Sequence, residues 1–177
     1  LQATFSQIDH AEFDQIAGLM ADGNRKIYAM GGRITHSIAD YFVTHMKVIR
    51  QNVTLISETS SAWPPALIDM EKGDVLLALD IRRYENNVLQ VVEIAADQGA
   101  EVVLITDQWV SPAAAHARYR LSAHVEAPSA WDSTVAIQVL METLLAAVEN
   151  LTWDETQSRM RRLEELYARA RMFRRGK

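Results

Sequence analysis

Short apolar runs alternate along the chain with longer segments of helical periodicity. The runs predict five strands, at residues 26–30, 53–56, 75–79, 102–105 and 120–125. Three of them are almost uninterrupted apolar sequences, as expected of strands buried on both faces. Since strands alternating with helices are typical of a parallel sheet covered on both sides, the chain is predicted to be an α/β protein. We expect a three-layer α-β-α sandwich around a five-stranded parallel sheet of flavodoxin-like or Rossmann-like type, followed by C-terminal helices.

Residues that begin and end helices occur between the predicted strands. Helices are expected to start near Asp9, Thr35, Pro64, Asn86 and Ser111. Asn86 and Ser111 are suitable N-caps, and Pro112 suits the first helical position after Ser111. Helix ends are predicted at three glycines that precede strands: Gly23, Gly73 and Gly99. The capping residues and the hydrophobic pattern therefore predict the same order of elements.

Two long helices are predicted after the last strand, at residues 131–150 and 154–173. The first carries an apolar stripe of helical spacing, formed by Val135, Val139, Leu140, Leu144 and Val148. Further apolar residues broaden this stripe, so the helix needs two apolar partners. We expect its own sheet to be one partner and a second subunit to be the other, which makes the protein a homodimer or a higher homo-oligomer.

The composition is that of a globular protein. Its 177 residues, 49% of them hydrophobic, suffice for a single domain with one substantial core. We place that core at about residues 8–150 and expect a helical extension at 151–177. The sequence contains no cysteine, which removes disulfides, thiolate metal sites and a catalytic thiol and favours a cytoplasmic location. Apolar runs such as 75–79 are too short to span a bilayer, so no membrane partner is expected.

Charge is distributed unevenly around the net value of −5. Residues 159–177 carry eight basic and two acidic side chains, a net +6, whereas residues 1–158 carry ten basic and 21 acidic ones, a net −11. A surface this acidic does not favour nonspecific binding of nucleic acid. The basic segment would contact DNA or a neighbouring acidic segment, or it is simply a solvated helix face.

Two loops at strand ends carry unusual side chains. In an open parallel sheet, ligands bind where the carboxyl ends of strands lead into helices. After the first strand, Gly31 and Gly32 allow the backbone to approach a ligand closely, and the helix beyond Thr35 offers free N–H groups to an anion. Arg33 adds a planar donor suited to phosphate or carboxylate.

The second loop follows the third strand and contains Asp80, Arg82, Arg83 and Tyr84. If the two loops converge, three arginines surround one pocket, which predicts a small anionic ligand. Each feature also has a structural explanation: the glycines as a tight turn, Asp80 as the partner of Arg82 or Arg83 in an ion pair, and His36 as a solvent-facing residue. The candidate ligand-binding residues are Gly31, Gly32, Arg33, Thr35, His36, Asp80, Arg82, Arg83 and Tyr84.

No cofactor or metal site is predicted. The five histidines have no ligand spacing, and HExxH and paired-carboxylate motifs are missing from the sequence. The glycine turn matches neither a Walker loop nor a GxGxxG fingerprint.

The two loops and the fourth strand resemble the sugar isomerase (SIS) family over about residues 8–150. That family shows a GxGxS turn followed four residues later by a small residue, and here residues 31–35 read GGRIT with Ala39 four positions on. Its Gly-Ala-x-Val-Ile-x-Ile-Thr strand is matched by residues 99–106, and its Ser-Pro helix start by Ser111 and Pro112.

The arrangement is similar to the effector domain of RpiR-like bacterial transcription regulators, in which a helix-turn-helix domain precedes the SIS domain. The resemblance implies a ligand-sensing, dimerising domain with no enzymatic activity, which binds a small anionic metabolite. DNA would be contacted only through the helix-turn-helix domain, which these residues do not contain. Because the sequence starts at Leu1 and not at Met, we expect that this domain was removed.

The departures from the family pattern concern the ligand. Where the family has SxSGxT, whose hydroxyls cradle a sugar phosphate, residues 80–85 read DIRRYE, and Arg33 replaces a glycine of the first turn. The ligand is therefore expected to be an anionic carbohydrate derivative, a phosphosugar or a sugar acid, that is bound by arginines. Two alternatives stay open: a phosphosugar isomerase with Glu85, Glu126 or His36 as the base, and a dimerisation module without a ligand. No catalytic residue is assigned.

Overall fold

Five parallel strands form the centre of the computed structural model, which describes residues 1–173. They are β1 (Ile27–Gly31), β2 (Val53–Leu55), β3 (Val75–Asp80), β4 (Glu101–Asp107) and β5 (Tyr119–Ala123). Their spatial order is β2-β1-β3-β4-β5, and all neighbours pair in parallel. This is the flavodoxin-like order, so the predicted strands and the predicted fold class are confirmed.

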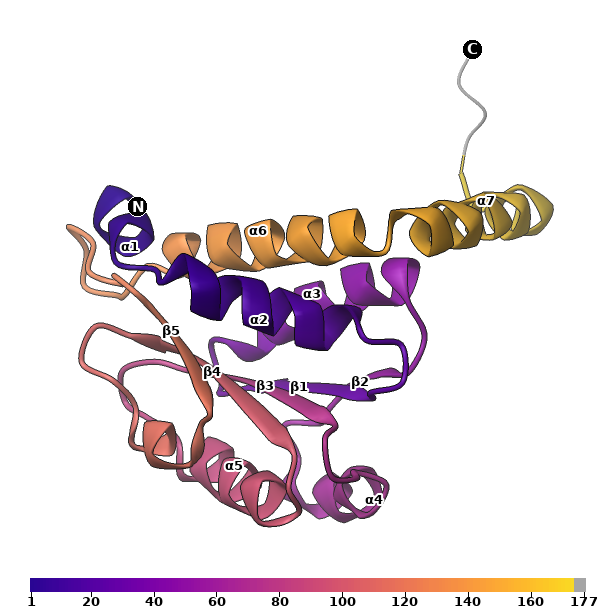
Figure 1. Ribbon diagram of the computed structural model, residues 1–177. Coiled ribbons are helices and arrows are strands. Elements are labelled where there is room, and N and C mark those ends of the chain that lie inside the picture. The colour runs from indigo at the N-terminus through magenta and orange to yellow at the C-terminus, as the bar shows by residue number, and fades with distance from the viewer. Residues whose placement is uncertain (174–177) are drawn as a thin grey trace.

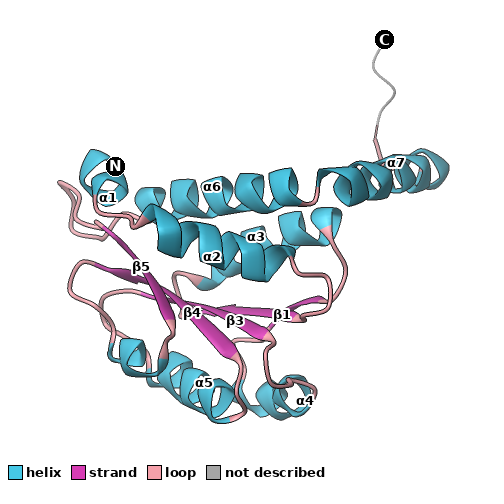
Figure 2. Ribbon diagram, viewed as in Figure 1, coloured by secondary structure: helices cyan, strands magenta, loops and turns pink. Residues whose placement is uncertain are grey.

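Helices cover both faces of the sheet (Figures 1 and 2). Helices α2 (His10–Ala21) and α3 (His36–Ile49) lie on one face, and α4 (Trp63–Ile68), α5 (Asn86–Asp97) and the 3-10 helix η2 (Pro112–His116) lie on the other. Along β1, Ile27 and Ala29 pack toward α2 and α3, whereas Tyr28 and Met30 pack toward α4 and α5. The alternation of side chains thus divides the interior into two cores, one on each face.

The helix starts predicted between the strands are accurate to about one residue, with differences in capping. The carboxylate of Asp9 accepts the N–H of Ala11 at 2.8 Å, and Ser111 Oγ accepts the N–H of Ala113 at 3.1 Å. Asn86 as an N-cap was wrong: Glu85 is the N-cap of α5, and its side chain makes no capping bond. Two short helices, α1 (Gln2–Ser6) and η1 (Ser60–Ala62), were not predicted.

Helix α6 (Val135–Leu151) lies over α2 and α3, outside the sandwich (Figure 1). It starts four residues after the predicted Trp131, because residues 124–134 form a loop. Its inner face is buried through Ala136, Ile137, Leu140, Met141, Leu144, Leu145 and Val148. The expectation that this helix packs on the sheet was wrong, since its inner face packs mainly against α2 and α3. A second subunit on its outer side stays a prediction.

Helix α7 (Trp153–Ala170) packs against α3 near its start and extends past the edge of the sheet (Figure 1). Thr156 is fully buried there, and Arg159 Nε donates to the carbonyl of Lys47 at 2.9 Å. Residues 174–177, the end of the predicted extension and of its basic segment, lie outside the described residues.

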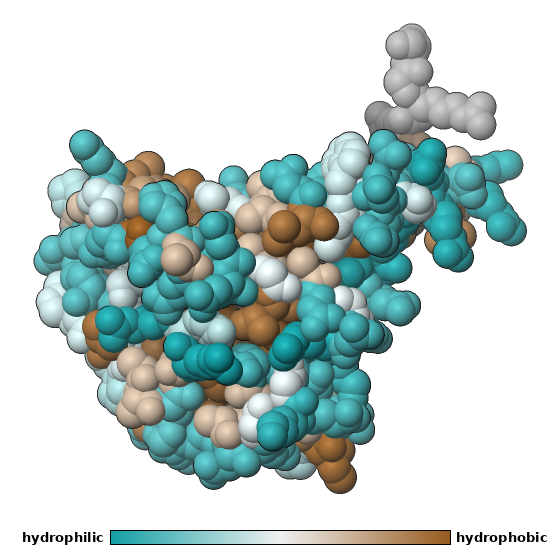
Figure 3. Space-filling model, viewed as in Figure 1, coloured by the Kyte–Doolittle hydropathy of each residue, from teal (hydrophilic) through white to brown (hydrophobic). Residues whose placement is uncertain are grey.

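The face seen in Figure 3 is mostly hydrophilic, with small and separate apolar patches. Within residues 1–173, no single helix is both long and apolar enough to cross a membrane. Helices α6 and α7 meet that criterion only as a pair bent by 102°.

Candidate functional site

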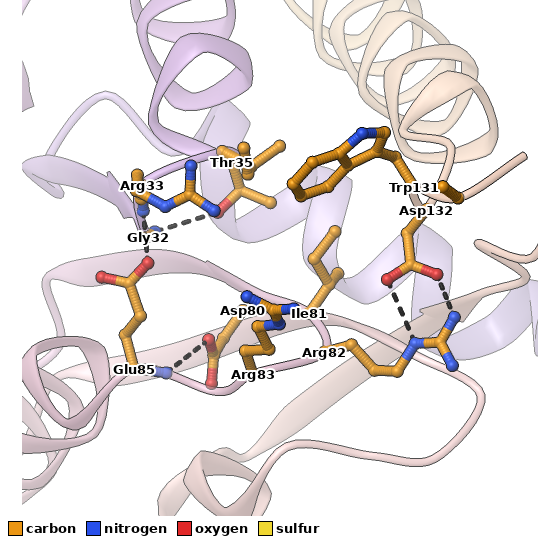
Figure 4. Close-up of a pocket in the computed structure, with 12 residues that line it drawn as sticks. Gly32, Arg33, Thr35, Asp80, Ile81, Arg82, Arg83, Glu85, Trp131 and Asp132 are labelled. Atoms are coloured by element: carbon orange, nitrogen blue, oxygen red, sulfur yellow. Dashed lines mark hydrogen bonds and ion pairs between the residues drawn. The ribbon is translucent and has the colours of Figure 1, made fainter.

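A cavity of about 480 Å³ lies at the carboxyl ends of β1 and β3 (Figure 4). Residues 32–35 after β1 and residues 80–83 with Glu85 after β3 form most of its wall, and residues 130–132 close the third side. Strand β2 lies beyond β1 and strand β4 lies beyond β3, so the chain changes direction between these two strands. In this fold such a switch point opens the crevice in which ligands bind. The two loops therefore meet, as their positions in the sequence predicted.

The glycine turn is held to the sheet by Thr35. Its hydroxyl donates to the carbonyl of Leu79 at 2.7 Å and accepts the N–H of Gly32 at 2.9 Å. A Cβ added to Gly31 would lie 2.5 Å from the carbonyl carbon of Thr35, so Gly31 is required for the close approach of α3 to β1. Gly31 and Thr35 thus fix the shape of the turn, a role that the sequence pattern did not separate from ligand contact.

Asp80 is buried at the end of β3 and holds the second loop from inside. It accepts a hydrogen bond from the hydroxyl of Ser111 and one from the N–H of Glu85 at 3.2 Å. Burial raises the pKa of Asp80 above its ordinary value of 3.8, against the opposing effect of these two bonds. Within residues 1–173 it makes no ion pair with Arg82 or Arg83, so that structural explanation is wrong.

Arg82 turns instead toward the third side of the cavity, where its guanidinium forms a two-pronged ion pair with Asp132 (Figure 4). It also lies over the ring of Trp109, 4.1 Å from the centroid. The hydrogen bond with Asp132 raises the pKa of Arg82. This pair connects the loop after β3 with the loop that carries the exposed Trp131.

Tyr84 does not line the cavity, and its hydroxyl fastens the second loop to the end of β4. Its hydroxyl donates to Asp107 Oδ1 at 2.8 Å, and burial together with this bond raises the pKa of Tyr84 above its usual range. Asp107 is fully buried and also accepts the N–H groups of Arg82, Trp109 and Val110, at 2.7, 3.0 and 3.1 Å. Four donors thus satisfy the oxygens of this buried carboxylate.

Two of the three predicted arginines have no acidic partner among residues 1–173. Within the described part of the chain, the side chains of Arg33 and Arg83 make neither a hydrogen bond nor an ion pair. Figure 4 shows both guanidinium groups directed into the space between the loops. Arg83 has a φ of 63°, which is uncommon for a residue with a side chain. The carboxylate of Glu85 accepts the backbone N–H of Arg33 at 2.5 Å.

The cavity includes six of the nine predicted ligand-binding residues: Gly32, Arg33, Thr35, Asp80, Arg82 and Arg83. Gly31 lines a smaller neighbouring cavity of about 230 Å³, and His36 and Tyr84 line neither of the two. Ligand binding by any of the nine stays a prediction.

Three residues of the site were not predicted as such: Asp107, Trp131 and Asp132. Glu85 was considered only as a base in the isomerase alternative and not as a ligand-binding residue. Trp131 was assigned to a helix, although the preceding residues Pro128 and Ser129 are signals of a loop. Recognising that loop would have placed Trp131 and Asp132 near the strand ends.

Solved structures with the same fold include a domain of a transcription factor and an isomerase. The sugar isomerase domain of the RpiR transcription factor from Sphaerobacter thermophilus superimposes with a TM-score of 0.87 at 18% identity, covering 93% of this chain and 92% of that one. The NanR protein of Vibrio vulnificus, solved with ManNAc-6P, gives 0.80 at 17% identity and covers 96% and 65%. Phosphoheptose isomerase from Neisseria gonorrhoeae gives 0.64 at 20% identity and covers 84% and 89%.

At these identities the structural likeness establishes the fold. No curated protein matches the sequence. The family model of the SIS domain matches residues 20–148, which include all five strands and both loops of the cavity. The chain belongs to the SIS domain family.

Proposed function

We propose that this SIS domain is the ligand-sensing and dimerising part of an RpiR-like transcription regulator in the cytoplasm, and that it binds an anionic carbohydrate derivative. The observation that carries the proposal is the pair of uncommitted guanidinium groups, Arg33 and Arg83, in the cavity between β1 and β3. Both arginines are exposed at the mouth of the cavity. Because neither guanidinium is bonded to an acidic side chain of the described residues, its donors are available to a phosphate or carboxylate, which it binds more strongly than a neutral sugar. The likeness to the RpiR domain and to NanR supports this proposal.

A sensing role is favoured over catalysis by the state of the candidate bases. Isomerisation needs a base within hydrogen-bond reach of the substrate C–H proton that is transferred. Glu85 is engaged by the N–H of Arg33, Glu126 lines a neighbouring cavity, and His36 lines neither cavity beside the glycine turn. The ligand would therefore be bound without being converted.

Sensing also requires that the ligand prefers one arrangement of the subunits. Apolar side chains at the junction of α6 and α7 are available for subunit contact: Leu151 is 60% exposed and Trp153 is 49% exposed. We propose that the dimer forms there and along the outer side of α6. Sedimentation equilibrium of a Leu151→Glu, Trp153→Glu variant tests this, and an unchanged association constant would refute it.

The ligand is tested by calorimetric titration of the chain with N-acetylmannosamine 6-phosphate, glucose 6-phosphate and gluconate, and with the neutral parent sugars. We expect at least one anionic compound to bind and its affinity to fall by about a hundredfold or more in an Arg33→Ala, Arg83→Ala variant, since each of the two lost charged hydrogen bonds contributes about 1.5–3 kcal/mol. Arg118→Ala is the matched control, because its guanidinium pairs with Glu101 outside the cavity. Equal binding of the neutral sugars would refute the proposal.

A phosphosugar isomerase is the second candidate, supported by the likeness to the phosphoheptose isomerase. An isomerisation assay with aldose and ketose phosphates distinguishes the two functions. Turnover that disappears in Glu85→Gln or Glu126→Gln would replace sensing by catalysis. Binding of the same compounds without turnover would support the sensor.

A further inference from the structure

The carboxylate of Glu85 lies directly on the glycine turn (Figure 4). Its Oε1 is 2.5 Å from the backbone nitrogen of Arg33, and a Cβ added to Gly32 would come within 2.7 Å of the same oxygen. Gly32 therefore leaves the space that the carboxylate fills. The contact joins residues 52 positions apart in the sequence, one on each side of the cavity.

This contact is not explained by the local needs of α5. Glu85 is the N-cap residue of that helix, yet its side chain makes no capping hydrogen bond and reaches across to the other loop. The backbone N–H of Glu85 is already bonded to Asp80, so the main chain is fixed independently of the side chain. The carboxylate can be removed while the loop keeps its anchor.

The carboxylate changes which chemical groups the cavity accepts. An incoming phosphate finds the N–H of Arg33 already bonded and meets a negative charge beside it, and like charges at short range repel. Oε2 of Glu85 has no donor within residues 1–173 and is available as an acceptor. The guanidinium groups of Arg33 and Arg83 remain the places where an anion is favoured.

We propose that Glu85 is a specificity-determining residue that excludes an anionic group from the glycine turn. In its place the turn receives a hydrogen-bond donor of the ligand, a hydroxyl or an amino group, while the anionic group of the same molecule lies at Arg33 and Arg83. The orientation of the ligand rests on the proposed function. The exclusion of a simple anion from the turn is independent of that function.

Inorganic phosphate is the probe that isolates this effect. We expect calorimetric titration of the complete chain to show that Glu85→Ala binds phosphate about tenfold or more tightly than the original protein, the gain of one charge-assisted hydrogen bond. Glu85→Gln keeps an acceptor for the Arg33 N–H but loses the charge. Its affinity for phosphate should therefore be intermediate between those of the original protein and Glu85→Ala. Addition of phosphate should shift the amide signal of Arg33 in the ¹H–¹⁵N spectrum of Glu85→Ala and leave it in place in the original protein.

Glu58→Ala is the control for the loss of one negative charge nearby. Glu58 lines the smaller cavity together with Arg33 and is exposed, and among residues 1–173 its carboxylate accepts no hydrogen bond from the turn. An equal gain in Glu58→Ala, or no gain in either Glu85 variant, would overturn the proposal. The role of Glu85 is decided by phosphate titrations of the Glu85 variants. The proposed function is decided by sugar ligands and the arginine variants, so the failure of one can be told from the failure of the other.

Discussion

The hydroxyl of Tyr84 donates a 2.8 Å hydrogen bond to the buried carboxylate of Asp107, which fastens the loop after β3 to the end of β4. Asp107 holds the same loop a second time through the N–H of Arg82. This loop contains no glycine and still takes a positive φ at Arg83. Because such a conformation needs support from its surroundings, the position of the arginines depends on a residue of the neighbouring strand.

Replacing Tyr84 with Phe is expected to remove one donor from Asp107 while leaving the ring in place. The free energy of unfolding should fall by about 1 kcal/mol, since a buried carboxylate loses one of its four donors. Urea denaturation measures this. Tyr41→Phe is the control, because the hydroxyl of Tyr41 bonds to Glu142 at the surface and its loss should change little. Equal losses of unfolding free energy in the two variants would show that the hydrogen bond from Tyr84 to Asp107 stabilises the fold no more than a surface hydrogen bond does.

Gly31→Ala is expected to destabilise the fold by roughly 1–3 kcal/mol, the usual cost of forcing an extra methyl group into a packed site. The new Cβ would meet backbone atoms of Thr35 and His36 at 2.5–2.6 Å, and these cannot rotate away. Gly18→Ala is a matched control in α2, where a Cβ meets nothing within 4 Å. It should stabilise the protein by about 0.5–1 kcal/mol through helix propensity. Thermal or urea unfolding distinguishes the two, and a neutral Gly31→Ala would contradict the packing role of this glycine.

The sheet and the site's location could be predicted because both depend on local pattern. Apolar runs such as residues 75–79 identify strands that are buried on both faces, and glycine and arginine loops directly after such strands must lie at one edge of a parallel sheet. The convergence of Arg33 and Arg83 followed from that rule alone.

The partners of individual side chains could not be predicted, because they depend on contacts across loops. Asp80 is next to two arginines in sequence, yet it turns inward to Ser111, 31 residues away, and Arg82 pairs with Asp132, 50 residues away. Sequence proximity favoured the wrong ion pair. The same holds for Glu85, whose carboxylate crosses the cavity to a backbone amide, a contact that no residue pattern indicates.

Asp80→Asn is expected to change how stability depends on pH. Burial raises the pKa of Asp80 in the folded protein above its unfolded value, so the folded state binds the proton more tightly. The resulting stabilisation is complete below the unfolded pKa and is lost as the pH rises through the folded pKa. The stability of the original protein relative to Asp80→Asn should therefore decline in urea titrations as the pH rises above the unfolded pKa of about 4. A relative stability that rises over this range would mean that the bonds from Ser111 and Glu85 outweigh burial.

The ion pair between Arg82 and Asp132 is expected to hold the loop with Trp131 more than it stabilises the fold. The two side chains are 44% and 25% exposed, and pairs of this exposure contribute little to global stability. Residues 124–134 form a loop whose tip is exposed, so local opening there does not require unfolding of the core. Arg82→Ala should thus speed chymotryptic cleavage after Trp131 by about two- to fivefold with little change in the urea midpoint. Arg118→Ala is the control, because it removes an exposed pair with Glu101 elsewhere on the surface, and it should be cleaved at the rate of the original protein. If Arg82→Ala were also cleaved at that rate, the loop would be held by contacts other than the Arg82–Asp132 pair.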